Sequence, residues 1–224
     1  MADFSLPLFP LSTVLFPGGV LPLRIFEVRY LDLISRCHRE GAPFGVVCLT
    51  HGSEVRQPRR QAEPDAVPGD EFEPQAFAPV GTMAHIIEVE SPQAGLMMIR
   101  CTGGRRFRLS HREQLKHGLW VGDAQWLPDD LPVSVPPDLA HVKLALERLV
   151  QNMQATMSQM DALPLQLPYR WDDCGWLANR WCEILPVSSQ LKQQFMVLES
   201  PLVRLELVAD LLERLKIGAP PAAE

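Results

Sequence analysis

Few residues of this chain stand in a pattern that could do chemistry. None of the six histidines pairs with another at i+4 on a helix, and His111 and His117, which flank a turn, do not complete a metal site by themselves. No cysteine pair has the Cys-x-x-Cys spacing. The chain also lacks a phosphate-binding G-x-x-x-x-G-K-[ST] loop and a G-x-S-x-G nucleophile motif. We therefore expect no catalytic residue, no metal and no cofactor, and hence no enzyme.

A local concentration of positive charge lies at Arg105, Arg106, Arg108 and Arg112, with Phe107 between them. Such a cluster could contact an anionic ligand. The same alternation is also typical of the solvent side of a half-exposed strand. We retain Arg105, Arg106 and Arg108 as candidate anion contacts. A serine–lysine dyad is disfavoured, because the chain has only four lysines, Lys116, Lys143, Lys192 and Lys216. Lys143 and Lys192 fall on predicted solvent faces of helices, and Lys116 falls in a turn.

The bulk composition limits the class of protein. The 224 residues are 46% hydrophobic and carry a net charge of −6, so the chain can form a core and is not suited to nonspecific nucleic-acid binding. Residues 4–23 are uncharged, but their prolines and glycines disfavour a membrane helix. The five cysteines are odd in number, which favours buried free thiols and a cytoplasmic protein.

Proline marks two regions that must position these residues. Fifteen of the 21 prolines lie in residues 1–137, which indicates strands and turns there, and six lie in the remainder. Edge strands are expected over 4–11 and 13–16, a turn at 17–19, and an extended stretch over 20–26. Glu27 opens a helix that Gly41 ends, and a buried strand follows over 44–50.

Residues 51–79 hold five prolines and read as a long irregular loop. Strands are then expected over 80–90, 96–101, 106–110 and 119–127, with turns at 91–95 and 102–104. Strands in this order with glycine turns favour a small barrel or curled sheet.

A helical pattern starts at Asp138. Apolar residues step by three or four from Leu139 to Met160, which predicts a long helix with a core stripe. Asp172 or Asp173, Ser188 and Ser200 are candidate caps for three further helices, and Gly218 would stop the last one. Four helices with short connections favour a bundle.

Three blocks of sequence carry a resemblance to a known family. They are Phe16 to Tyr30 (FPGGVLPLRIFEVRY), Val80 to Ile86 (VGTMAHI) and Gly103 to Leu109 (GGRRFRL). Together they resemble the signature of the Lon protease amino-terminal, substrate-binding domain. The resemblance continues through Trp176-Leu177 and Arg204-Leu205 and covers nearly the whole chain.

The resemblance implies an α+β fold: a PUA-like β pseudo-barrel with an inserted helix over residues 1–135, followed by a C-terminal helical bundle over 136–224. It also implies a stand-alone relative that lacks the ATPase and protease modules of full-length Lon. The signature itself has a structural interpretation as well, in which Pro17 to Gly19 turn the chain, Ile25 and Phe26 fill the core, and Glu27 starts the helix.

The function implied is a noncatalytic module that recognises protein or peptide segments, with a protease or chaperone as a further partner. The candidate peptide contacts are Phe16, Leu21, Arg24, Phe26, Arg29, Tyr30, Phe72 and Phe77. A small-ligand or RNA binder that uses a PUA-like groove is the first alternative, although nucleic acid is disfavoured by the net charge. A peptidase is the second alternative. No membrane partner is expected.

Overall fold

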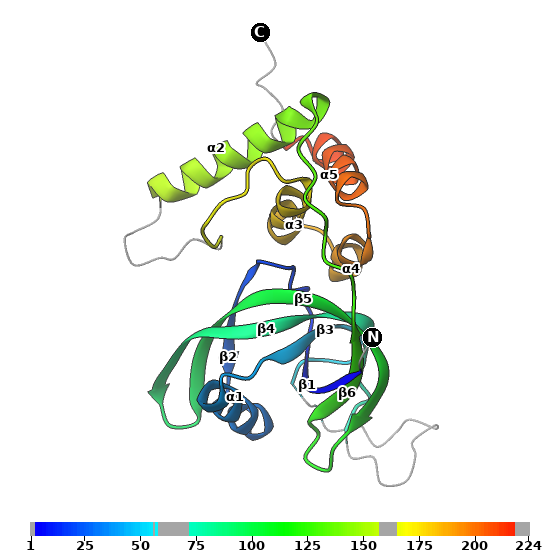
Figure 1. The fold of residues 1–224 in the computed structure, drawn as a ribbon. Helices are drawn as coiled ribbons and strands as arrows, with labels where there is room; N and C mark the ends of the chain where they lie inside the picture. The colour runs from blue at the N-terminus through cyan, green and yellow to red at the C-terminus, as the bar shows by residue number, and fades with distance from the viewer. Residues whose placement is uncertain (1–2, 56, 58–71, 157–164, 218–224) are drawn as a thin grey trace. The chain divides into compact units, whose positions relative to one another are not determined.

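The computed structural model describes residues 3–55, 57, 72–156 and 165–217. It confirms an α+β chain in which strands come first and helices follow (Figure 1). The strands and the helix among them are β1 (Phe4–Leu11), β2 (Val20–Ile25), α1 (Val28–Glu40), β3 (Phe44–His51), β4 (Ala76–Gln93), β5 (Leu96–Gln114) and β6 (Trp120–Trp126). A short 3₁₀ turn and four helices follow: η1 (Pro137–Leu139), α2 (Ala140–Thr156), α3 (Cys174–Ile184), α4 (Ser189–Val197) and α5 (Pro201–Leu215).

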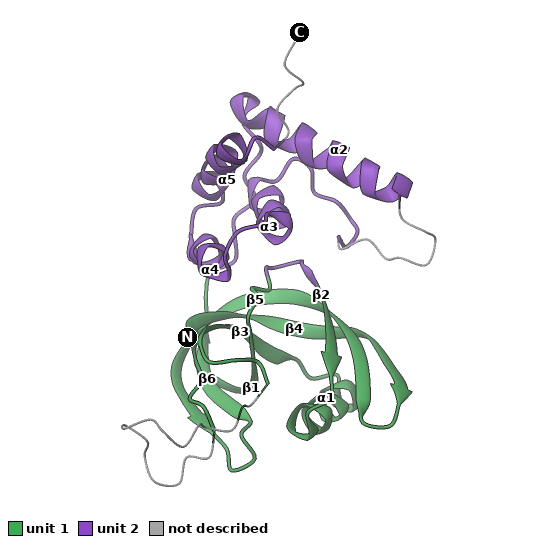
Figure 2. Ribbon diagram, turned by 180° about the vertical axis from the view of Figure 1, so that it is seen from behind, with its two compact units in different colours: residues 1–15, 21–127 green, residues 16–20, 128–224 purple. Residues whose placement is uncertain are grey.

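The chain divides into two compact units, which Figure 2 colours separately. The β unit comprises residues 1–15 and 21–127, and the helical unit comprises residues 16–20 and 128–224. The linker after Leu127 packs on the helices, because Cys174 N donates to Val133 O over 2.8 Å. The boundary expected at 135/136 falls inside this same linker.

The β unit contains a closed ring of strands. The strand order is β2-β5-β4-β3-β1-β6, and an additional pairing of β5 with β6 closes the ring of the last five strands. β1 and β3 pair in parallel, so the chain between them must cross over, and it does so through β2 and α1. β2 hydrogen-bonds to β5 and stands at one end of the order.

Three expectations for the strands were wrong. β1 is not an edge strand, because it pairs with β3 on one side and with β6 on the other. Residues 13–16 do not form a strand. Residues 102–104 do not turn the chain, since β5 runs through them and Gly103 pairs with Ala84 of β4. Glycine is suited to this place because a Cβ on Gly104 would lie 2.8 Å from His85 Nε2.

The predicted loop over 51–79 is shorter at its end, since β4 already starts at Ala76. Its residues 56 and 58–71 lie outside the described residues. Phe72 takes part in an isolated bridge next to that gap.

Helix α1 forms as the sequence predicts. Glu27 is its N-cap, and Gly41 ends it in the left-handed conformation with φ 63°. One face is buried and carries Tyr30, Leu33, Ile34 and Cys37. These residues form one cluster with apolar residues of the sheet, in which Phe9 stacks on Tyr30 with ring centroids 3.9 Å apart.

The helical unit packs around α3, whose residues Cys174 to Cys182 are all buried. Its helices begin at the expected caps: Asp173 accepts from Trp176 N, Ser188 from Leu191 N and Ser200 from Val203 N. α5 ends at Lys216 in the left-handed conformation, so Gly218 is not its cap residue. Gly218, Met157 and Met160 lie outside the described residues.

Arg204 connects the elements of the helical unit although its side chain is only 1% exposed. It donates to both carboxylate oxygens of Asp130, to Asn179 Oδ1 and to the carbonyls of Phe195 and Leu198. A buried charge needs such partners, because desolvation without them is costly.

Two further findings concern the whole described chain. All five cysteines are buried free thiols, as expected. Among the described helices, none is long and apolar enough to cross a membrane.

Candidate functional site

A groove runs beside strand β2, and we call it the β2 groove. It has a volume of about 260 Å³. Its lining comes from the end of β1, from β2, from the start of α1 and from the segment after β3: Phe9, Leu11, Pro22, Leu23, Arg24, Ile25, Phe26, Glu27, Tyr30, Glu54 and Val55. Phe26 is 53% exposed, which is unusual for a phenylalanine and marks the groove as an apolar surface open to solvent.

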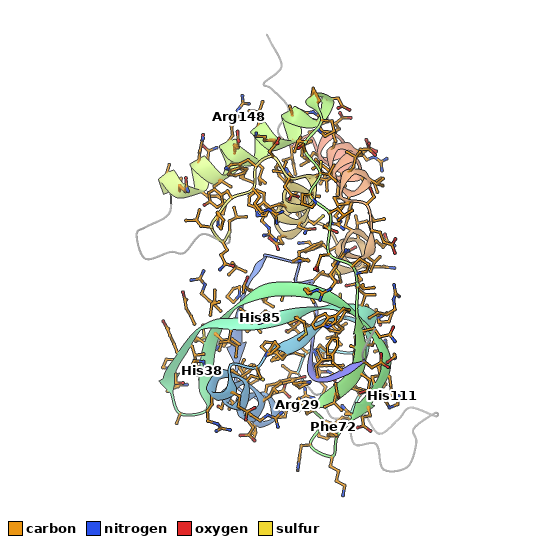
Figure 3. All side chains as sticks on the ribbon, viewed as in Figure 1. Arg29, His38, Phe72, His85, His111 and Arg148 are labelled. Atoms are coloured by element: carbon orange, nitrogen blue, oxygen red, sulfur yellow. The ribbon has the colours of Figure 1, made fainter. Side chains whose placement is uncertain are left out.

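Arg29 fixes the backbone around the start of α1. Its guanidinium donates to Gly118 O over 2.6 Å and to Glu54 O over 3.4 Å, and it pairs with the Glu27 carboxylate at 3.1 Å. It also lies over the Tyr30 ring, 4.4 Å from the centroid. Figure 3 labels Arg29 at this position in the β unit. Arg29 thus holds the Glu54 wall of the β2 groove against helix α1.

A second groove, of about 580 Å³, is lined by Arg29 and lies between α1 and the β5–β6 connection. Val28, Leu33, Leu115 and Leu119 give it apolar walls. Arg29 thus lines the second groove and holds one wall of the β2 groove, and its guanidinium contacts backbone carbonyls, the Glu27 carboxylate and the Tyr30 ring.

The structure brings three of the eight predicted peptide contacts together in the β2 groove: Arg24, Phe26 and Tyr30. Arg29 lines the second groove. Leu21 is partly buried against the cluster around α1.

The other three predicted contacts lie elsewhere. Phe16 is completely buried and belongs to the helical unit. Phe77 is buried beside Trp120, and Arg112 lies over its ring, 4.7 Å from the centroid. Phe72, labelled in Figure 3, is partly buried and does not line the β2 groove.

The three candidate anion contacts differ in how far their side chains are exposed to solvent. Arg106 is buried, with 6% of its surface exposed, and Arg105 lies over the Trp126 ring, 4.9 Å from its centroid. Arg108 is exposed and pairs with Val80 in the β4–β5 ladder. Arg105 and Arg106 are neighbours on β5 and so point to opposite faces, whereas Arg106 and Arg108 lie two positions apart and differ in burial, so the three side chains do not form one open basic patch.

Two walls of the β2 groove come from segments that the sequence did not indicate as part of a binding site. Phe9 and Leu11 come from β1, and Glu54 and Val55 come from the segment after β3. Glu54 also accepts a hydrogen bond from Ser12 N over 2.6 Å, which fixes that segment beside the end of β1. No local pattern marks these residues, because their place depends on contacts between distant segments.

Within the described residues, no group of three or more histidine, cysteine or acidic side chains could hold a metal ion. Burial raises the pKa of the Cys101 and Cys182 thiols to about 12, so both stay protonated near neutral pH and are poor nucleophiles. What the geometry offers is an apolar groove along a strand, with charges of both signs at its rim.

Comparison with known proteins decides the family. The model of the ATP-dependent protease La (LON) substrate-binding domain matches residues 5–214. The chain belongs to this family. Within it, the chain is 26% identical over 214 residues to Lon protease of Anaeromyxobacter dehalogenans and 25% identical over 210 residues to Lon protease 2 of Myxococcus xanthus. Each match covers 93% of the chain and 23% of the relative, so the chain spans less than a quarter of those proteases.

Solved structures agree with this assignment. A Lon N-terminal domain protein from Xanthomonas campestris superposes with a TM-score of 0.67 at 28% identity, covering 92% of this chain and 98% of that one. The N-terminal domain of Lon protease from Mycobacterium avium complex shares the fold, with a TM-score of 0.57 at 15% identity over 92% of this chain and 97% of that one. The Lon resemblance and the α+β fold expected from the sequence are therefore confirmed.

Proposed function

We propose that this chain is a noncatalytic module that binds extended, apolar polypeptide segments at the β2 groove. The observation that carries this proposal is the run of five successive residues, Pro22 to Phe26, along the groove. Side chains of a strand alternate between its two faces. A groove lined by every residue of the run therefore follows the edge of β2 and not one face of it.

The outer edge of β2 suits this role. β2 stands at the end of the strand order, and no described strand other than β5 pairs with it. An extended polypeptide along such an edge can pair its backbone with β2, while the groove accepts alternate side chains. Pro22 in the strand is compatible with an edge position, because proline cannot donate to a ladder.

The chemistry of the lining indicates the kind of segment that fits. Phe9, Leu11, Phe26 and Val55 provide apolar contacts, so an apolar side chain gains free energy by leaving water there. The charged groups are of both signs, with Arg24 opposed by Glu27 and Glu54. This mixture favours an uncharged segment over a strongly acidic or basic one.

The family supports a place for such binding in proteolysis, since its description is that of a substrate-binding domain. We infer that the chain recognises protein substrates, and that a protease or chaperone is the partner to which they are passed. The alternative of a small-ligand or RNA binder has less support, because Arg106 is buried and Arg105 lies over the Trp126 ring. The peptidase alternative is not supported by the thiols of Cys101 and Cys182, because their raised pKa values keep them protonated.

The test is binding of a fluorescein-labelled, end-capped peptide of alternating valine and threonine, followed by anisotropy. Phe26→Glu places a charge in the groove and should weaken the affinity at least about tenfold. Ile87→Glu is the matched control, because Ile87 is also an exposed apolar residue of the β unit, at 41%, and does not line the groove.

A second probe tests the backbone pairing. The same peptide, N-methylated at every second residue on the edge-facing side, should bind much more weakly, since it can no longer donate to β2. Equal affinities of Phe26→Glu and Ile87→Glu would show that the binding surface lies elsewhere. Unchanged binding of the methylated peptide would exclude strand addition.

A further inference from the structure

The turn that precedes β2 is held by a buried arginine from α3. Arg180 is 1% exposed at its side chain, and it donates to Gly18 O over 2.5 Å and to Pro17 O over 2.9 Å. Both carbonyls belong to the signature block that carried the family resemblance. Figure 2 colours residues 16–20 with the helical unit, to which they belong.

A carboxylate completes the arrangement on the same helix. Arg180 pairs with Glu183 Oε1 at 2.7 Å, and Glu183 lies directly against the turn, since a Cβ on Gly19 would be only 1.9 Å from this oxygen. Lys192 of α4 donates to the Glu183 carbonyl over 2.9 Å and fixes that end of α3. We call Arg180, Glu183 and residues 16–19 the latch.

The latch leads straight into the proposed binding strand. Gly19 N donates to Phe16 O over 2.9 Å and closes the turn, and β2 starts at the next residue, Val20. Each consecutive Cα lies about 3.8 Å from the last, so a displaced Gly19 must displace the first residues of β2. β2 has a strand partner on one side only, so the turn is a second constraint on where it begins.

We propose that Arg180 is a positioning residue for the β2 groove: its grip on the Pro17 and Gly18 carbonyls sets the start of β2 and with it the affinity for an extended polypeptide. The proposal rests on the proposed function of the groove. It assigns control of binding to a residue of the helical unit that does not line the groove. It also gives the Pro-Gly-Gly block a role, since Gly18 and Gly19 leave the space that Arg180 and Glu183 fill.

The comparison that tests this is between two buried arginines of the helical unit. Arg180→Lys keeps the charge but cannot reach two carbonyls and a carboxylate with a planar fork. Arg204→Lys is the matched control, because Arg204 is equally buried and makes five hydrogen bonds against the three of Arg180, none of them to residues 16–20. A loss of general stability in the helical unit should affect both variants.

Two measurements are made on the whole chain. Hydrogen exchange of the amides in residues 18–25 needs no ligand, and Arg180→Lys should accelerate it about tenfold while Arg204→Lys leaves it within about twofold. The affinity for the capped valine–threonine peptide should fall about fivefold in Arg180→Lys and stay unchanged in Arg204→Lys.

The outcomes separate the two proposals. Unchanged exchange at residues 18–25 in Arg180→Lys overturns the latch, and so does an equal effect of the two variants on exchange and affinity. If the unaltered protein does not bind the peptide, the proposed function is wrong, and so is the proposed effect of Arg180 on peptide affinity. The hydrogen-exchange data alone then decide whether Arg180 positions β2.

Discussion

The β unit and the helical unit each use a buried arginine to hold a glycine-containing turn. Arg29 donates to the carbonyl of Gly118 and pairs with Glu27, while Arg180 donates to the carbonyl of Gly18 and pairs with Glu183. In both cases the guanidinium joins backbone segments that are distant in the sequence. The carboxylate balances the charge that burial would otherwise penalise.

The surroundings of the two arginines differ. Arg29 borders a groove of about 580 Å³ and holds one wall of the β2 groove. Around Arg180 the packing is close, since a Cβ on Gly18 would lie 3.2 Å from Nη1 and one on Gly19 would collide with Glu183. A buried arginine with a paired carboxylate can therefore support an open surface or fix a chain segment, depending on what packs beside it.

The largest effect that tests this comparison is expected from Arg180→Met. It removes hydrogen bonds of 2.5, 2.7 and 2.9 Å and leaves Glu183 without its cation, which should cost about 3 kcal/mol of unfolding free energy at pH 8. Arg29→Met removes one short bond, of 2.6 Å to Gly118 O, and two longer ones to Glu27 and Glu54, and should cost about 2 kcal/mol. Urea unfolding followed by circular dichroism measures both.

The double variant Arg180→Met with Glu183→Gln serves as the control for the unpaired carboxylate. It should recover part of the loss, because no charge is then buried alone. A smaller loss for Arg180→Met than for Arg29→Met would reverse the proposed order of the two sites.

A smaller effect is expected from Glu183→Gln, and it depends on pH. Burial raises the pKa of Glu183 to about 7 against the opposing effects of Arg180 and Lys192. The 16–20 segment, against which Glu183 lies, contains no titratable residue and so adds no charge near this carboxyl group. A raised pKa means that the stabilising contribution is complete below the ordinary value of 4.5 and is lost as the pH rises through 7.

The glutamine variant lacks this loss. From pH 5 to pH 8 its unfolding free energy should therefore rise relative to that of the unaltered protein, by an amount on the order of 2 kcal/mol. Unfolding curves at four pH values measure the difference. Parallel pH profiles for the two proteins would mean that Glu183 does not titrate in this range.

Local signals in the sequence predicted the helices well. Glu27 with Gly41, and the caps Asp173, Ser188 and Ser200, act on backbone groups a few residues away, so their pattern can be seen without the fold. The structural role of each glycine was harder to predict. Gly95 turns the chain as expected, but Gly103 and Gly104 lie inside β5, where the need is for close approach and not for a turn.

Long-range contacts explain what could not be predicted of the site. The turn at 17–19 is correct, yet its partner Arg180 is 162 residues away from Gly18, and nothing near either residue indicates the other. Phe16 belongs to the signature but is buried in the helical unit, whereas Phe26, ten positions on, is exposed in the groove. The residue types of the signature therefore identify the family, and packing alone divides them into structural and surface positions.

The smallest effect is expected from Gly18→Ala, compared with Gly95→Ala. The comparison separates the cost of the backbone conformation from the cost of packing against Arg180. Gly18 and Gly95 have similar backbones, with φ 71° and φ 76°, so alanine at either position costs about 1 kcal/mol for the left-handed conformation. At Gly95 nothing lies within 4 Å of the new Cβ, but at Gly18 it meets Arg180 Nη1 at 3.2 Å. Gly18→Ala should therefore cost a few tenths of a kcal/mol more than Gly95→Ala, and only Gly18→Ala should speed hydrogen exchange in residues 18–25. Equal costs, with exchange unchanged in both, would mean that Arg180 yields freely to the methyl group and does not grip the turn.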